Sequence, residues 1–456
     1  MSRRAPHGAR GQALVLGLTL LIVCGLGLFY AFSSGQAAIG RARLINATDA
    51  AAYSAGLVRA RAMNWYAYTN RAIVANEVAI AQAATMVSYA RFLERLTDNV
   101  EDVARYFPYV GQIAAALEEV AHYASELTRY TADVEVPVRS GHVAALAMSQ
   151  EAMLMATNAF TLSQVATEVA RANDRRFFAH ALAADVSGEA SDLTRRYEGA
   201  DRKRLRDVIV ASLDPFSTNR DNDIEVPGLP CGPKLARRGA TEMIRDHDTD
   251  TFDRWQAYDT LSLHLPRFLS CGTREVLPLG WGAAELARDP KGELDSLSGA
   301  DGGPTGGDSP GAISNPAASR SKRANPRAYE EASEEIWVAR GYRGLPATRE
   351  LDYQGSQALK DNPRYPVTRV AIVGRTNGLG PIATAQAAGH GRGRVQPIDR
   401  FARGRMTAIA TAEIYFRRPP QPLERGEYAS LYSPYWQVRL VETPAAWRLA
   451  AAEAFE

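Results

Sequence analysis

Residues 13–32 read ALVLGLTLLIVCGLGLFYAF, twenty consecutive positions without a charged side chain. At a rise of about 1.5 Å per residue, a helix of this length covers roughly 30 Å, the thickness of the hydrocarbon layer of a bilayer. A helix in the core of a soluble protein seldom lacks a polar side over such a length. The stretch therefore predicts a single membrane-spanning helix, and the rest of the fold has to be built from the residues C-terminal to it.

A cleaved secretory signal is the main alternative to a retained anchor. The basic start of the chain and the small residues around 31–33 would suit one. Signal h-regions, however, usually extend over about 7–15 residues. Residues 36–63 also continue in a helix-forming composition, with no breaker after the apolar stretch. We expect a retained anchor.

Basic residues flank the apolar stretch unequally. Arg3, Arg4 and Arg10 precede it, whereas only Arg41 and Arg43 come closely after it. Because positive flanks favour the cytoplasmic side, this asymmetry favours a cytoplasmic N-terminus. The bulk of the chain would then lie outside the cytoplasm.

Small residues recur along one side of the outer part of the span, at Gly27, Ala31 and Gly35. Small residues four positions apart let two membrane helices approach closely. Glycine is also common in membrane helices for other reasons. Helix packing at these three positions is thus one hypothesis, and ordinary membrane composition is the other.

The composition of the whole chain is that of a folded protein. Its 456 residues include 53 Lys and Arg and 51 Asp and Glu, a net charge of +2, and 46% are hydrophobic. A near-neutral balance excludes nucleic-acid binding driven by bulk charge.

Of the 24 prolines, only Pro6, Pro108 and Pro137 precede Pro215. Since proline interrupts helices, the residues before Pro215 can form long helices, and the composition of the residues after it is typical of strands and loops.

These patterns predict an α+β fold with three segments. The first, residues 1–35, is a cytoplasmic tip and transmembrane helix. The second, 36–213, is a long-helix stalk or bundle, with a turn at Pro137 and a further helix over 142–186. The third, 214–456, is a mixed head with strands at 259–265, 367–373, 408–416 and 435–442 and a flexible loop over 296–327.

Two cysteines lie in the predicted head, Cys231 and Cys271. In an oxidising compartment they could form a disulfide, and two unpaired thiols are the alternative. Cys24 lies inside the span, where it serves as a small apolar residue.

Catalytic and metal-binding patterns are not found in the sequence. The histidines show no His-Glu-x-x-His spacing, the glycine-rich stretch 374–380 lacks the Lys-Ser/Thr of a phosphate loop, and no Gly-x-Ser-x-Gly occurs. The acidic stretch 246–250 lacks the Gly and Glu that an EF-hand loop needs. We therefore expect no enzyme activity, no metal, no cofactor and no small-molecule substrate.

The N-terminal region resembles the TadE/TadG-like family of tight-adherence (Tad, Flp-type) pilus assembly systems. The likeness is carried by Arg10–Val15 (RGQALV), by Arg43–Ala52 (RLINATDAAA) and by Asn64–Ala72 (NWYAYTNRA). A second echo, in Ala412–Pro419 (AEIYFRRP) and Leu431–Gln437 (LYSPYWQ), is similar to the closing strands of large members of the group.

The resemblance implies a single-pass protein of the bacterial inner membrane, with other pilus-assembly or pilin-like subunits as partners. Gly11 and Gln12 correspond to the family's processing junction. Leu16 stands where pilin-like subunits carry Glu, so the resemblance implies neither cleavage after Gly11 nor ordinary filament incorporation. The implied role is pilus assembly or that of a minor pilin-like subunit.

Two other classes of function stay open on the sequence. One is a membrane-anchored adhesin or sensor whose extracytoplasmic head binds a ligand. The other is a membrane-tethered hydrolase with a site assembled from residues far apart in the chain.

Overall fold

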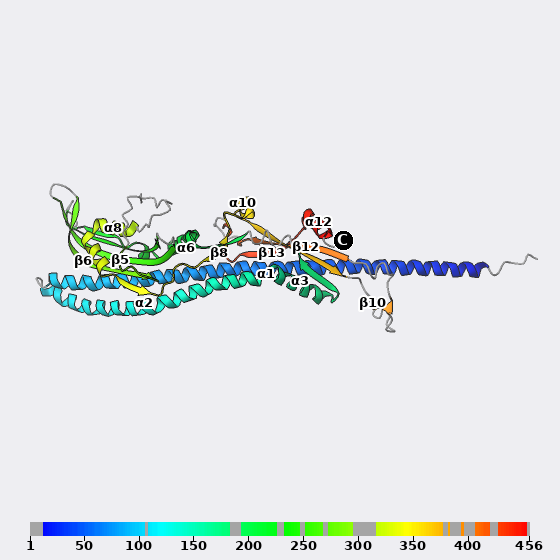
Figure 1. The fold of residues 1–456 in the computed structure, drawn as a ribbon, viewed down its shortest axis with the longest axis horizontal. Coiled ribbons are helices and arrows are strands. Elements are labelled where there is room, and N and C mark those ends of the chain that lie inside the picture. The colour runs from blue at the N-terminus through cyan, green and yellow to red at the C-terminus, as the bar shows by residue number, and fades with distance from the viewer. Residues whose placement is uncertain are drawn as a thin grey trace, which may run out of the picture. The chain divides into compact units, whose positions relative to one another are not determined.

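The computed structural model describes residues 12–104, 108–182, 193–225, 232–246, 251–267, 272–294, 316–376, 382–383, 394–395, 406–419 and 427–453 (Figure 1). It is a mixed α+β fold, as predicted, in which long N-terminal helices precede most of the strands. Residues 1–64, 153–194 and 351–456 form one compact unit, here called the first unit. Residues 65–152 and 195–350 form the second unit. The predicted boundaries after residues 35 and 213 stay a prediction.

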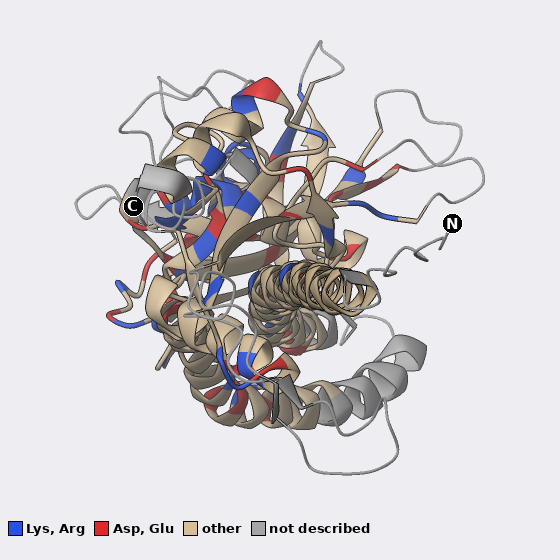
Figure 2. Ribbon diagram, turned by 90° about the vertical axis from the view of Figure 1, so that its right-hand side faces the viewer, with Lys and Arg blue, Asp and Glu red and all other residues tan. Residues whose placement is uncertain are grey.

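The first helix, α1 (Gln12–Ala104), is 93 residues long and includes the whole predicted span. No proline occurs between Pro6 and Pro108, so every residue of the helix can donate its backbone N–H. Its exposure changes along its length: the apolar side chains of 13–32 are exposed, whereas buried residues recur from Leu44 onward. In Figure 2, which looks along α1, the turns nearest the viewer carry no charged residue.

The second helix, α2 (Pro108–Ala156), runs antiparallel to α1 within the second unit (Figure 1). His122 Nδ1 lies 2.9 Å from Glu94 Oε1, and Arg139 Nη1 donates to Asn76 Oδ1 at 3.4 Å. Residues later in α2 therefore meet residues earlier in α1, as in a helical hairpin.

The predicted turn at Pro137 is wrong, because α2 continues through this residue. Proline cannot donate to the carbonyl of residue 133, but Asp133 and Pro137 both lie on the exposed side of the helix. Water can bond the freed carbonyl there, so the helix persists.

The predicted helix over 142–186 is interrupted at residues 157–158 and is wrong after Asn173. After α2 come α3 (Ala159–Asn173) and then the strand β1 (Phe177–Ala181). Asn158 caps α3, and its side chain accepts from the backbone N–H of Thr161 at 2.9 Å. Pairing of β1 with a strand almost 200 residues later overrides the helical composition of this stretch.

A four-stranded antiparallel sheet, in the order β1-β9-β12-β13, forms the centre of the first unit. Its other strands are β9 (Val367–Thr376), β12 (Met406–Phe416) and β13 (Trp436–Val441), which match three of the predicted strands. The helix α12 (Ala445–Glu453) packs on this sheet, where Trp447 and Ala451 join a cluster with Ala371 and Val373.

A five-stranded sheet, in the order β3-β4-β5-β6-β7, forms the centre of the second unit. Neighbouring strands are antiparallel except β6 and β7, which are parallel. The bounds are β3 (Asn222–Glu225), β4 (Lys234–Asp246), β5 (Thr251–Pro266), β6 (Thr273–Ala287) and β7 (Trp337–Arg340). β5 contains the predicted strand over 259–265.

Helices cover both faces of this sheet. Alternate residues of β5 point to opposite sides: Asp259 meets α1 at Ser88, whereas Thr260 meets Ser321 of α8 (Pro316–Ala324). The helix α9 (Pro326–Glu334) packs on the same side as α8, where Tyr329 joins a cluster with Tyr258. α8 occupies 316–324 and α9 begins at 326, so this part of the predicted loop is mostly helical, and residues 296–315 lie outside the described residues.

The remaining elements are short. Two-stranded sheets are formed by β2 (Thr194–Tyr197) with β8 (Thr348–Leu351) and by β10 (Ile382–Ala383) with β11 (Arg394–Val395). The short helices are η1 (Gly199–Arg202), α6 (Lys203–Ala211), α7 (Pro215–Thr218) and α10 (Gln357–Asp361).

Candidate functional site

The described residues contain one helix that is long and apolar enough to cross a membrane, and it begins near the N-terminus. The predicted span 13–32 is exposed at every position. Its one side-chain hydroxyl outside the aromatic residues, on Thr19, donates back to the carbonyls of Val15 and Leu16 at 3.0 and 2.9 Å. The hydroxyl of Thr19 is thus hydrogen-bonded within its own helix, which would suit a position in hydrocarbon.

The small residues Gly27, Ala31 and Gly35 lie in α1 on an exposed face. A Cβ atom built on Gly27 or Gly35 would meet nothing within 4 Å. Described residues of this chain therefore do not pack against these two glycines, and the helix-packing hypothesis concerns contacts with another molecule. Cys24 is exposed with a free thiol.

The other sequence-predicted site residues lie mostly outside the described residues. Gly11, Cys231 and Cys271 belong to this group, and Gln12 is the first residue of α1. The strand after each of these cysteines begins beside the end of β5. Lys234, the first residue of β4, pairs with His264, and Thr273, the first residue of β6, pairs with Pro266.

The stretch 43–52, which carries the family resemblance, packs tightly in the first unit. Ala47, Thr48, Ala51 and Ala52 are at most 1% exposed. A side chain on Gly374 of β9 would collide with Thr48, so helix and strand touch directly here. The small residues of this stretch thus act as the surface on which the sheet rests.

Asn64 joins α1 to the start of β13 in the first unit. Its Nδ2 donates to the carbonyl of Trp436 at 3.0 Å, and its Oδ1 accepts from the backbone N–H of Trp436 at 3.0 Å. About two helical turns earlier, a Cβ atom on Gly56 would collide with Ala412 and Val438. The amide therefore substitutes for a neighbouring strand at this edge position.

Asn70 has a similar role in the second unit. Its Nδ2 donates to the carbonyl of Arg349 at 2.9 Å, and its Oδ1 accepts from Gln150 Nε2 at 2.7 Å. Gln150 Oε1 in turn accepts from the backbone N–H of Arg349 at 2.8 Å. Two buried amides thus join α1, α2 and β8.

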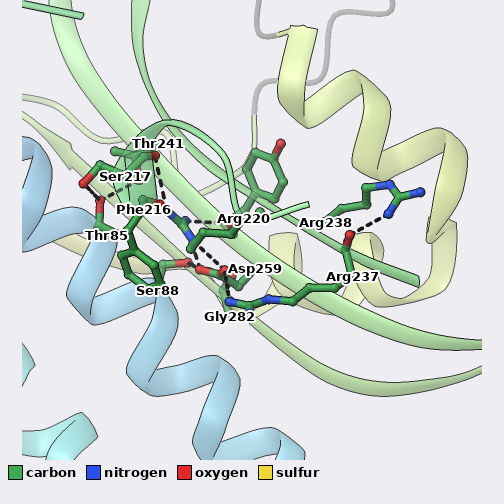
Figure 3. A network of polar contacts seen from close by, with 12 residues as sticks. Thr85, Ser88, Phe216, Ser217, Arg220, Arg237, Arg238, Thr241, Asp259 and Gly282 are labelled. Carbon is green, nitrogen blue, oxygen red and sulfur yellow. Dashed lines mark hydrogen bonds and ion pairs between the residues drawn. The ribbon is translucent and has the colours of Figure 1, made fainter. Parts of the chain in front are cut away.

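A buried ion pair lies between β5 and the segment after α7 (Figure 3). Arg220 Nε donates to Asp259 Oδ1 at 2.7 Å, and Nη2 donates to Oδ2 at 3.0 Å. Nη2 also donates to the carbonyl of Tyr258, and Nη1 to those of Phe216 and Ser217. All five N–H groups of the guanidinium are therefore used within the protein.

Hydroxyl groups of α1 extend this network across the sheet face (Figure 3). Ser88 Oγ lies 2.9 Å from Asp259 Oδ2 and 3.1 Å from the carbonyl of Gly282. Thr85 Oγ1 lies 2.7 Å from Thr241 Oγ1. The network fixes α1 on β4, β5 and β6, and its central ion pair is enclosed by the protein, so its role is structural.

Glu77 is a second buried acid of α1 in the second unit, with 0% exposure. Its Oε2 accepts from the hydroxyl of Tyr342 at 2.9 Å and from Trp255 Nε1 at 3.3 Å. Burial raises the pKa of Glu77 to about 7, although these two hydrogen bonds oppose the rise. The group is enclosed by a Tyr and a Trp that are themselves 0% exposed.

The buried His264 is bonded on both ring nitrogens. Nε2 lies 2.9 Å from Asn325 Oδ1, and Nδ1 lies 3.5 Å from Thr273 Oγ1. Asn325 also donates to Ala236 O and to Thr260 Oγ1. Within the described ranges no group of three His, Cys, Asp or Glu side chains is placed to hold a metal ion.

Sequence reasoning missed Arg220, Asp259 and Glu77. The alternation of β5 places Asp259 on the same face as Trp255 and Ala257, and an acid on an apolar face signals a buried partner. Nothing local identifies that partner as Arg220, 39 residues earlier.

Comparison with known protein families, curated proteins and solved structures gives no match to this chain.

Proposed function

We propose that this chain is a non-enzymatic, membrane-anchored component of Tad (Flp-type) pilus assembly, or a minor pilin-like subunit of such a system. Residues 13–32 anchor it in the bacterial inner membrane with the N-terminus in the cytoplasm. The remainder acts outside the cytoplasm, and its partners are other pilus-assembly or pilin-like subunits.

The observation that carries the proposal is the contact between the two parts of the sequence that resemble the family. The N-terminal part supplies Asn64, which bonds Trp436 of the C-terminal echo. Gly56, which lies between two of the N-terminal segments, packs against Ala412 of the same echo. These parts are about 350 residues apart in the chain, yet they form one packed helix–sheet contact in the first unit. Contact between two segments that resemble the same family is what a shared fold would produce, and it supports the proposal.

The hydrogen bonding of three buried polar residues, Arg220, Asp259 and His264, supports a structural role for them. Arg220 donates all its N–H groups within the protein, and Asp259 accepts from Arg220 and Ser88. His264 is bonded on both nitrogens. A general base or nucleophile needs a free lone pair next to space for a substrate, and these groups are already occupied by hydrogen bonds.

Mass spectrometry of the mature N-terminus tests the anchor. We expect Met1 or the residue after it as the first residue if the anchor is retained, and Gln12 if the chain is processed like a pilin. A mature chain that begins near Ser34 would contradict anchoring by 13–32, because the span would then have been removed as a signal.

Deletion of the gene tests the assembly role. We expect the deletion strain to lose Flp-type pili from its surface and to regain them when the full chain is restored. As a matched control, a chain that retains residues 1–35 fused to an unrelated folded domain should not restore the pili. Unchanged piliation of the deletion strain would instead point to the adhesin or sensor class, which would be tested by ligand binding to the full chain.

A further inference from the structure

The outward side of α2 carries a row of large apolar side chains in addition to the row that packs inward. The inward row includes Ala121, Ser125, Ala132, Val136, Ser140 and Val143, all of them buried. The outward row consists of Tyr123 (65% exposed), Leu127 (66%), Tyr130 (71%), Val134 (52%), Val138 (51%) and Met148 (73%). We call these six residues the outer seam.

The spacing of the outer seam is that of a helix–helix contact. Its members from 123 to 138 are separated by steps of four, three, four and four, and Gly141 and Ala145 continue the row to Met148. Steps of three and four keep side chains on one stripe of a helix, as in a coiled coil. A soluble surface seldom exposes this many large apolar residues in one row.

The charges beside the outer seam select the kind of partner. Between Ala121 and Val138 the exposed charged residues are His122, Glu126 and Asp133, and exposed Lys and Arg are absent from this described stretch. Glu126 and Asp133 lie on the same flank of the seam, since they are seven residues apart. Glu126 Oε1 lies 3.6 Å from His122 Nε2 of the same helix, but a second copy of this chain offers no exposed Lys or Arg along this stretch to face Asp133. Self-association would therefore leave Asp133 without a basic partner.

From this geometry we infer that the outer seam of α2 docks an amphipathic helix of another protein, one whose apolar row is flanked by Lys or Arg. Tyr123 and Tyr130 supply large aromatic contacts of the type that anchors protein interfaces. The basic flank of the partner faces Glu126 and Asp133. The inference concerns the chemistry of the partner and does not depend on the assembly system proposed above.

Site-specific photo-crosslinking of the full chain in its own cells tests this. A benzophenone amino acid is placed at Tyr130 or Val134, with Glu330 on the exposed side of α9 as the control position. We expect an adduct with one other protein from both seam positions and not from Glu330. The cross-linked segment should show apolar residues at steps of three and four beside Lys or Arg.

Charge reversal supplies the second readout. Glu126→Lys combined with Asp133→Lys should lower the adduct yield at least about fivefold, because like charges then face each other. The matched pair Glu330→Lys and Glu334→Lys on α9 should leave the yield unchanged. Exchanging the cross-linked Lys or Arg of the partner for Glu should restore the yield in the reversed chain.

Three results would overturn the inference. An adduct of twice the mass of this chain would identify a second copy as the occupant. An adduct with lipid would identify a membrane surface. A yield at Tyr130 and Val134 no higher than at Glu330 would show that the outer seam has no occupant.

Discussion

Glu77 shows what a single buried carboxyl group does to the stability of its unit. It lies between Tyr342 and Trp255, and no cation pairs with it among the groups that shift its pKa. The folded state therefore favours the protonated, neutral carboxyl, because burial raises the free energy of the charged carboxylate.

We predict that stability falls between pH 4.5 and about 7 because of this residue. Below 4.5 the folded and unfolded chains both hold the proton, so the group imposes no penalty. As pH rises, the unfolded chain releases the proton first, and the folded chain keeps it until about pH 7. The loss levels off above that pH at about 3 kcal/mol, since one pH unit corresponds to about 1.4 kcal/mol.

Thermal unfolding of the full chain across pH 4–8, wild type against Glu77→Gln, measures this effect. The amide keeps an acceptor for Tyr342 and Trp255 but cannot ionise. The variant should match the wild type at pH 4 and exceed it at pH 8. Parallel pH profiles for the two proteins would show that Glu77 does not titrate in this range.

The Arg220–Asp259 pair predicts a second effect at this scale. Arg220→Met leaves the buried Asp259 carboxylate without its main partner, which should destabilise the chain by about 3–5 kcal/mol. The double variant Arg220→Met, Asp259→Leu removes both charges and should recover part of that loss. The exposed pair Arg195–Asp201 is the control, and Arg195→Met should cost less than about 1 kcal/mol in denaturant unfolding.

At the scale of elements, contact between α1 and β6 depends on a missing side chain. A Cβ atom on Gly282 would collide with the backbone of Ser88 and Phe92. In α2, by contrast, Gly141 has nothing within 4 Å of such an atom. Gly282 therefore allows helix and strand to approach closely, whereas packing does not require a glycine at position 141.

We predict opposite signs for the same substitution at these two positions. Gly282→Ala should destabilise the chain by about 1–3 kcal/mol, because helix and strand must move apart. Gly141→Ala should raise stability by about 0.5–1 kcal/mol, because alanine restricts the unfolded chain and suits a helix interior. Denaturant midpoints of both variants measure this, and a loss of stability at Gly141 would mean that this face is packed.

The sequence predicted several elements whose signal is local. The long α1 and the strands β5, β9, β12 and β13 are expected from proline content and alternation, and the structure confirms them. β1 was not predicted, because its strand state depends on pairing with β9 and not on the residues Phe177–Ala181 themselves. A turn was predicted at Pro137, but α2 continues through it. The sequence does not show whether the carbonyl that loses its helical hydrogen bond is exposed to water.

The candidate site was less predictable, for a related reason. The apolar stretch 13–32 and its small residues could be picked out from the sequence, because they are local features, and their roles stay predictions. The contacts of Arg220 with Asp259 and of Asn64 with Trp436 join residues 39 and 372 positions apart. Such pairs depend on the tertiary packing of sheets against helices, which the local patterns of a single sequence do not reveal.

At the scale of the whole molecule, the compartment of the chain decides the state of its cysteines. If the bulk of the chain lies outside the cytoplasm, Cys231 and Cys271 are in an oxidising environment. We predict that the full chain purified under non-reducing conditions is two mass units lighter than after reduction, and that it carries one alkylatable thiol, Cys24. Three alkylatable thiols before reduction would indicate unpaired cysteines.

Because α1 is continuous in the first unit, its contact with the sheet also sets the rotation of residues 13–32 about the helix axis. Each residue turns a helix by about 100°, so the direction in which Gly27 and Ala31 point is set by Thr48 and Gly56, which are held against the sheet. One residue inserted after Phe32 would leave the sheet contact intact and rotate residues 13–32 by about 100° relative to the sheet, whereas seven inserted residues would return them to within about 20°. If residues 13–32 cross a membrane, as proposed, the packed sheet thus fixes which side of the helix faces its neighbours there.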